Sequence, residues 1–262
     1  MNIYRKYGQE PYSTVVVHGG PGAPGGMGYF ARVLSEKRGV LEPFQTLNTI
    51  AGQVEELYSV IQEKCPDMKI KLIGHSWGAW LAFIFTARYP ELVEKLILVG
   101  AAAFEEQYNT DLMFIRLSRL DESELKEVQQ LMENLKNPEN GSSDSVGFNR
   151  LGELMAKTEI YDCLTVDDAV VEFQPEIFQS VWSEADKLRK NGDLIKFAGR
   201  ISCPVVAIHG DYDPHPSEGI KEPLSRELSD FRFVLLPNCG HFPWKEKLAR
   251  KDFFEILDEE LS

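Results

Sequence analysis

The pentapeptide Gly74-His75-Ser76-Trp77-Gly78 constrains this chain more than any other stretch. It follows a strand-like segment at 69–73, and it precedes a helical pattern at 77–89. A G-x-S-x-G sequence at such a junction predicts a sharp strand-to-helix turn that lifts the serine side chain clear of a sheet. Glycine on both sides removes Cβ atoms that would collide in so tight a turn. The pattern therefore predicts Ser76 as a nucleophile, with a purely structural turn as the weaker alternative.

Strand-like and helix-like segments alternate along much of the chain, as a parallel sheet with crossover helices requires. Strands are expected at residues 14–18, 39–42, 69–73, 95–100, 204–209 and 231–236. Helices are expected at residues 27–37, 49–64, 77–89 and 253–261. The alternation stops between 104 and 200, where the chain is charge-rich and mostly helical. The sequence thus predicts an α/β core, built from residues 1–103 and 201–262, with residues 104–200 as a helical insertion.

The charge balance limits the partners of the chain. It has 28 Lys and Arg against 41 Asp and Glu, a formal net charge of −13, and is expected to repel nucleic acid and anionic membranes. No apolar run reaches the roughly 18 residues that span a bilayer, and the N-terminal residues do not resemble a signal peptide. Four scattered cysteines fit free thiols and a cytoplasmic location. No metal site or cofactor is expected, and the oligomeric state is left open.

A second glycine-rich segment, His18-Gly19-Gly20-Pro21-Gly22, ends the first clear strand. Two consecutive glycines let backbone N–H groups approach a substrate, so Gly20 is the candidate for one oxyanion donor. The amide of Trp77, at the start of the helix that follows Ser76, is the candidate for the other. Phosphate binding is a weak alternative, because the P-loop pattern is absent and Pro21 and Pro24 remove two amide donors.

Candidates for an acid and a base follow the last two predicted strands. The segment 210–216 (GDYDPHP) follows one, and the segment 239–244 (CGHFPW) follows the other. Both come just after the carboxyl ends of strands, where open α/β sheets place ligands. A neutral serine needs an imidazole to take its proton and a carboxylate to orient that imidazole. His241 is expected as the general base, and Asp211 and Asp213 are the two candidates for the acid.

The other histidines are expected to have lesser roles. His18 is predicted to brace its loop by hydrogen bonding and His209 to be a satisfied core residue. His75 is predicted to contact the catalytic residues rather than the substrate. His215 lies beside the acid and is expected to contact solvent or substrate.

With these residues in place, the chain resembles the α/β-hydrolase superfamily, and within it the proline iminopeptidase group. The specific matches are HGGPG at 18–22 and GHSWG at 74–78, and the regions of the acid and the histidine also match. The order serine, acid, histidine along the chain is that of α/β-hydrolases. The resemblance implies a mostly parallel sheet, a Ser-His-Asp triad that forms an acyl-enzyme, and an oxyanion hole. The insertion at 104–200 falls where the family carries a helical cap above the active site.

The resemblance also separates the two acidic candidates. In the family the acid falls three residues after the glycine that ends the strand and three before a proline, which favours Asp213. Asp211 is expected to stabilise the turn instead. The family's usual loop after the fourth strand is missing, so Glu42 and Gln45 are expected near the site in its place. Only about 13 residues precede the strand at 14–18, which leaves little room for the family's opening hairpin.

Substrate identity is not determined by these patterns. The expected substrate is a small ester or amide, or a short peptide with an N-terminal aminoacyl group. A carboxylesterase, a lyase or C–C hydrolase on the same triad, and a hydrolase-fold protein that binds a ligand without turnover remain alternatives.

The insertion is strongly acidic. Residues 104–200 contain 20 acidic and 11 basic residues, so one or two carboxylates there are expected to pair with a substrate's α-amino group. Glu172, flanked by apolar residues, is the first candidate and Glu159 the second. The alternative is that both face water.

Overall fold

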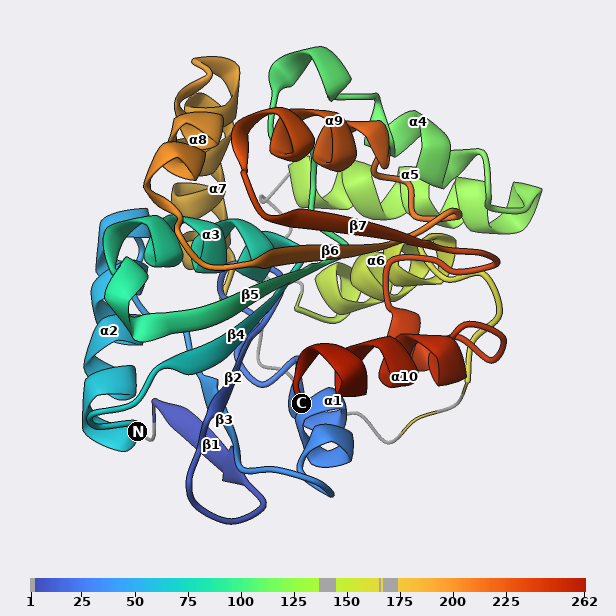
Figure 1. Cartoon of the computed structure of the whole chain (residues 1–262). Coiled ribbons are helices and arrows are strands. Elements are labelled where there is room, and N and C mark those ends of the chain that lie inside the picture. The colour runs from blue at the N-terminus through green and yellow to red at the C-terminus, as the bar shows by residue number, and fades with distance from the viewer. Residues whose placement is uncertain (1–2, 137–144, 165, 167–173) are drawn as a thin grey trace.

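The computed structural model describes residues 3–136, 145–164, 166 and 174–262 (Figure 1). At its centre, these residues form a seven-stranded sheet in the order β1-β3-β2-β4-β5-β6-β7. β1 pairs antiparallel with β3, and every other neighbouring pair is parallel. The mostly parallel sheet expected from the sequence is therefore confirmed. The strands are β1 (Tyr4–Tyr7), β2 (Thr14–Val17), β3 (Val40–Pro43), β4 (Ile70–His75), β5 (Val93–Val99), β6 (Val205–Gly210) and β7 (Phe231–Leu236).

Helices cover both faces of the sheet. On one face α1 (Gly28–Leu34) and α10 (Arg250–Glu260) lie side by side (Figure 1), and Phe30 packs against Phe253. The other face carries α2, α3, α8 and α9. Nearly every residue of α3 is buried, because this helix packs against the sheet on one side and against other helices on the other. These helices are α2 (Ile50–Lys64), α3 (Trp77–Arg88), α8 (Asp193–Lys196) and α9 (Glu218–Glu227).

The chain between β5 and β6 is mostly helical, as the sequence predicts. Its longer helices are α4 (Leu112–Leu117), α5 (Glu122–Lys136), α6 (Ser145–Thr158) and α7 (Pro175–Lys190). α5 and α6 enclose a small apolar cluster of their own, whereas Ile177, Val181 and Ala185 of α7 pack into the main core. The division of the chain at residues 104 and 200 stays a prediction. Short 3-10 helices lie at Pro90–Leu92, Glu106–Tyr108, Phe197–Arg200 and Pro243–Lys245.

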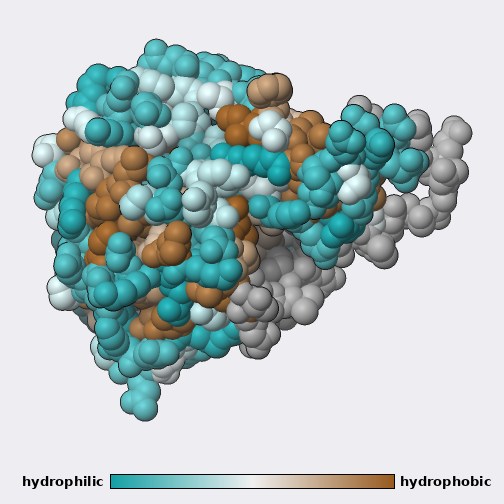
Figure 2. Space-filling model, turned by 90° about the vertical axis from the view of Figure 1, so that its right-hand side faces the viewer, coloured by the Kyte–Doolittle hydropathy of each residue, from teal (hydrophilic) through white to brown (hydrophobic). Residues whose placement is uncertain are grey.

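The face of the molecule in Figure 2 is largely hydrophilic, with smaller hydrophobic groups between the hydrophilic residues. Among the helices within the described ranges, none combines the length and apolar character needed to cross a membrane.

Candidate active site

Ser76 lies at the sharp turn between β4 and α3. Its φ of +55° and ψ of −120° belong to a region that residues with a side chain rarely adopt. A Cβ atom on Gly74 would lie 2.2 Å from the carbonyl oxygen of Gly78, and one on Gly78 would lie 2.3 Å from that of Val17. Both positions therefore require glycine. The turn holds Ser76 at the start of α3, on the wall of a cavity of about 600 Å³.

The glycine-rich loop after β2 lies directly against this turn. A Cβ atom on Gly19 would come within 2.9 Å of both the Ser76 Cβ and the His75 Nδ1. Gly20 follows with a φ of +63°, and its carbonyl accepts a hydrogen bond from Ala23 N in a tight turn. Gly20 and Trp77 both line the cavity that Ser76 lines. The structure thus brings the two candidate oxyanion residues to the same cavity as the candidate nucleophile.

Hydrogen bonds of His18 and Gln45 connect the glycine-rich loop to the turn at Ser76. The Gln45 side-chain amide donates to the His18 carbonyl at 2.9 Å and accepts from Trp77 Nε1 at 2.8 Å. The Gln45 backbone N–H donates to His18 Nε2 at 3.3 Å. Burial lowers the pKa of His18 to about 4, so its ring is neutral and can accept this bond. The expected bracing role of His18 is confirmed, and Gln45 supports the site without lining the cavity.

The candidate acid and base meet beyond the ends of β6 and β7. His241 Nδ1 donates to Asp213 Oδ2 at 2.7 Å, and both residues are buried. Burial alone would raise the pKa of Asp213, but His241, His209 and His215 together hold it well below its ordinary value. For His241, burial lowers the pKa, but Asp213 and Glu159 outweigh burial and raise it. An ionised carboxylate therefore orients a ring that has an increased tendency to hold a proton.

Asp211 lies apart from this pair. Its side chain is exposed, and Oδ1 accepts a hydrogen bond from Cys239 N at 3.2 Å. The stabilising contact expected of Asp211 is therefore made with the neighbouring loop, which carries His241, rather than within its own turn.

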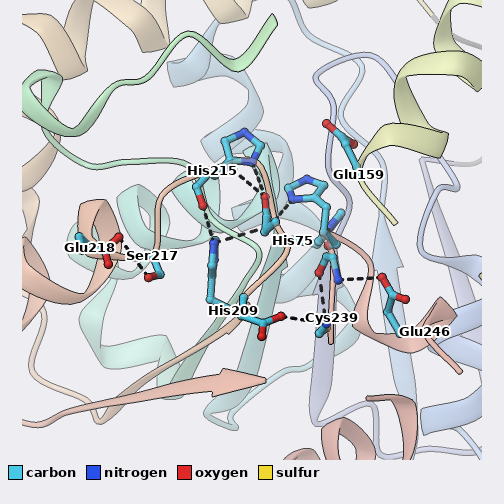
Figure 3. Close-up of polar contacts among 12 residues, drawn as sticks. His75, Glu159, His209, His215, Ser217, Glu218, Cys239 and Glu246 are labelled. Atoms are coloured by element: carbon cyan, nitrogen blue, oxygen red, sulfur yellow. Dashed lines mark hydrogen bonds and ion pairs between the residues drawn. The ribbon is translucent and has the colours of Figure 1, made fainter. Parts of the chain in front are cut away.

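The remaining histidines surround the acid and the base (Figure 3). His75 Nε2 lies 2.9 Å from the His241 carbonyl, and His209 Nε2 lies 2.9 Å from the His215 carbonyl. The expected structural roles of His75 and His209 agree with these contacts. His215 lines the cavity, as expected, but its Nδ1 also donates to Asp213 Oδ1 at 2.8 Å. The sequence did not reveal this last contact.

A buried glutamate beside His241 was also missed by the sequence analysis. Glu246 is fully buried, and its carboxylate accepts hydrogen bonds from Gly240 N at 2.7 Å, Tyr161 N at 2.9 Å and Asp162 N at 2.8 Å. Glu246 therefore ties the loop that carries His241 to the segment that follows α6. In the sequence it resembles an ordinary surface acid, because two of its three partners lie about 85 residues away.

Replacing Glu246 by alanine is expected to destabilise the fold. Three backbone N–H groups lose their acceptor, one of them buried and two part-buried, and each unsatisfied buried donor costs about 1–3 kcal/mol. We expect the free energy of unfolding in urea to fall by about 3 kcal/mol or more. Glu255→Ala, at an exposed position of α10, is the matched control and should change it by less than about 0.5 kcal/mol. A Glu246→Ala variant as stable as this control contradicts the prediction.

The cavity is lined by both aromatic and charged side chains. Phe178 and Trp182 line it from α7, and Trp182 stacks on the buried Trp80 at a centroid distance of 5.8 Å. Arg116, Glu159 and Lys245 also line it. The cavity therefore suits a substrate with an apolar portion and a polar portion.

The three glutamates expected to bind substrate lie in different places. Glu159 lines the cavity, is only 7% exposed, and is paired with the Arg116 guanidinium. The structure does not bring Glu42 to the cavity. Glu42 is fully buried in β3, where it accepts from Tyr7 Oη at 2.6 Å and Met27 N at 3.0 Å, and burial raises its pKa. Glu172 lies outside the described residues.

One group of side chains has the composition of a metal site. Asp213, His215 and His241 each offer a ligand atom, and these atoms lie within 4.8 Å of one another. Both rings already donate from Nδ1 to the carboxylate. A metal ion bound by the carboxylate would have to displace these hydrogen bonds, so the arrangement fits an acid–base pair better.

Comparisons with known proteins show which family this chain resembles. The sequence pattern of the family described as alpha/beta hydrolase fold matches residues 34–248. Monoacylglycerol lipase ABHD6 of Homo sapiens is 27% identical over 214 residues, which are 80% of this chain but only 60% of that protein. Proline iminopeptidase of Lactobacillus crispatus (strain ST1) is 23% identical over 275 residues, 97% of this chain and 92% of that protein.

The solved structures include similar folds. A proline iminopeptidase structure from Mycobacterium smegmatis aligns with a TM-score of 0.64 and 16% identity, over 98% of this chain and 93% of that one. The family match covers most of the sheet, the turn at Ser76 and the loop that carries His241. The chain belongs to the α/β hydrolase fold family.

Proposed function

We propose that this chain is a serine hydrolase that cleaves a small ester or amide through an acyl-enzyme on Ser76. The observation that carries the proposal is the strained turn of Ser76 beside a His241–Asp213 pair joined at 2.7 Å, with Ser76 and His241 on one cavity. His241 takes the hydroxyl proton as Ser76 attacks the carbonyl carbon, and Asp213 stabilises the imidazolium that forms. The amides of Gly20 and Trp77 receive the oxyanion.

The same groups complete the formation of the acyl-enzyme and then hydrolyse it. The imidazolium of His241 gives its proton to the leaving alcohol or amine as the tetrahedral intermediate collapses to the acyl-enzyme. A water molecule then attacks the ester on Ser76, and His241 takes a proton from this water. Collapse of the second intermediate returns the proton to the Ser76 oxygen and releases the acid.

A fluorophosphonate probe tests the proposal, because it labels only an activated serine. We expect one labelled site in the wild-type chain, mapped by peptide mass spectrometry to Ser76. Ser76→Ala should not be labelled, and His241→Ala should be labelled much more slowly. A wild-type chain that resists the probe would favour a protein that binds a ligand without turnover.

The cavity favours an ester of an apolar acyl group as the substrate. The aromatic side chains that line it, Phe178 and Trp182 among them, suit an apolar acyl group, since burying such a group in an apolar environment is favourable. Arg116 already neutralises Glu159, which leaves that carboxylate less available to a substrate's α-amino group. An aminoacyl amide is the second candidate, because Glu159 does line the cavity and proline iminopeptidases match nearly the whole chain.

N-acetylation of an aminoacyl amide separates these two substrates. Acetylation removes the positive charge, and we expect kcat/KM to stay nearly the same because Glu159 is paired with Arg116. Short-chain p-nitrophenyl esters should be hydrolysed in the same assay. A loss of tenfold or more on acetylation, equal to about 1.4 kcal/mol, would instead establish recognition of the amine.

The pH dependence of activity provides a further prediction. The base must be neutral, so kcat/KM should fall as the pH drops through the pKa of His241, which lies above its ordinary value of about 6.5. Glu159→Gln removes a charge that raises this pKa and leaves the charge of Arg116, which lowers it. The midpoint of the acid limb should therefore move to lower pH.

The control for this experiment is Glu153→Gln, at an exposed position of α6. It should leave the midpoint where it is in the wild type. A Glu159→Gln profile that stays in place or moves to higher pH contradicts the prediction.

A further inference from the structure

Asp213 accepts hydrogen bonds from two imidazole rings, one on each carboxylate oxygen, and a third ring has His209 Nε2 3.7 Å from Oδ2. Oδ2 accepts from His241 Nδ1 at 2.7 Å, and Oδ1 accepts from His215 Nδ1 at 2.8 Å. The two rings lie nearly parallel, with a centroid distance of 4.8 Å and an interplanar angle of 29°. Both rings line the cavity. The reaction proposed above uses His241, and it leaves His215 without a role.

The surroundings of His215 fix its position closely. Its backbone N–H also donates to Asp213 Oδ1, at 2.9 Å, and its carbonyl lies 2.9 Å from His209 Nε2. Pro214 and Pro216 flank it and restrict the backbone on both sides. His215 is 6% exposed. A ring held this firmly is suited to hold another group in place.

We propose that His215 is a positioning residue that fixes the plane of the Asp213 carboxylate so that Oδ2 faces His241. The terminal torsion of an aspartate is soft, so the carboxylate can rotate unless both oxygens are held. The backbone N–H of His215 contacts Oδ1 alone, and the ring adds a second donor to that oxygen from a different direction. The inference rests on the proposed function, because it assumes that Asp213 acts through His241.

The proposal requires a proton on His215 Nδ1, because only a protonated nitrogen can donate to the carboxylate. The competing explanation is packing alone, in which the ring fills space against His241 and an apolar ring serves equally well. In the first explanation the Nδ1–H donor of His215 is required, and in the second only the size and shape of the ring are required.

Two substitutions separate the hydrogen bond from the packing. His215→Phe keeps a ring of similar size and loses the donor. His215→Asn loses the ring but places an amide N–H near the position of Nδ1. The measurements are the rate at which a fluorophosphonate labels Ser76, and kcat and KM for a p-nitrophenyl ester.

We expect His215→Phe to lower the labelling rate and kcat by about 10- to 100-fold, with little change in KM, since a hydrogen bond to a charged group is lost. His215→Asn should retain most of both rates. A His215→Phe variant as fast as the wild type, or a His215→Asn variant as slow as His215→Phe, overturns the proposal.

If His215→Phe does not fold, a comparison of His215→Gln with His215→Asn tests the proposal instead. His215→Gln lacks the ring, as His215→Asn does, but its amide lies one bond farther from the backbone, near the position of Nε2. We expect the Gln variant to be slow and the Asn variant to be fast, and equal rates overturn the proposal. Failure of the wild-type chain to react with the probe would instead refute the proposed function itself.

Discussion

Replacing Ser76 by alanine is expected to abolish turnover, with a loss in kcat on the order of 10⁶, while the chain stays folded. Alanine has no oxygen with which to attack a carbonyl carbon. The Ser76 side chain makes no capping hydrogen bond to α3, so its loss should change the free energy of unfolding by less than about 0.5 kcal/mol. Hydrolysis of a p-nitrophenyl ester and unfolding in urea measure the two effects.

The comparison for this variant is Ser59→Ala, an exposed serine on α2 whose hydroxyl donates to the Glu55 carbonyl. It should retain full activity. A Ser76→Ala variant with more than about a tenth of the wild-type activity would show that another residue is the nucleophile, because loss of a true triad serine costs far more.

The sheet could be predicted from the sequence because its central strands are buried on both faces. Such strands appear as short apolar runs, and β6 (Val205–Gly210), in which every residue is buried, lies within one residue of the predicted range at each end. The missed edge strand β1 lacks this signal, because tyrosine and basic residues make up its four positions. The missed helix α9 has Pro223 in its interior, and a proline at such a position argues against a helix when only the sequence is known.

One predicted helix was too long. The pattern at residues 27–37 suggested a longer helix than α1 (Gly28–Leu34). Ser35 follows the last residue of α1, and its hydroxyl donates to the Arg32 carbonyl. A serine that bonds to the backbone in this way competes with the continuation of a helix. The spacing of apolar residues in the sequence does not reveal this competing hydrogen bond of Ser35.

The residues of the candidate site differ in how far the sequence predicted them. Ser76, His241 and Asp213 belong to short motifs, and their placement follows from the strands that precede them. Glu42 does not line the cavity, because its side chain is bound by Tyr7. This contact could not be predicted, since Tyr7 belongs to β1, a strand that the sequence did not reveal. Contacts such as those of Glu246 depend on segments far apart in the chain. Glu172 lies outside the described residues and stays a prediction.

Asp213→Asn is expected to lower kcat by about 10⁴, the typical effect of neutralising the acid of a triad. The amide of asparagine cannot stabilise the imidazolium of His241 as a carboxylate does. It also offers N–H donors to a ring that needs an acceptor at Nδ1, and this favours the wrong tautomer. Because Asp213 raises the pKa of His241, the acid limb of any residual activity should also move to lower pH.

The matched control is Asp211→Asn, two residues away and outside the network of histidines. Asparagine retains an oxygen that can accept the hydrogen bond from Cys239 N, so the loop that carries His241 should keep its position. We expect this variant to keep most of the wild-type kcat and an unchanged pH profile. The two carboxylates carry equal charge and neighbour each other in sequence, so the comparison isolates contact with His241 as the cause. If Asp211→Asn is the far more damaging change, Asp213 is not the acid of this site.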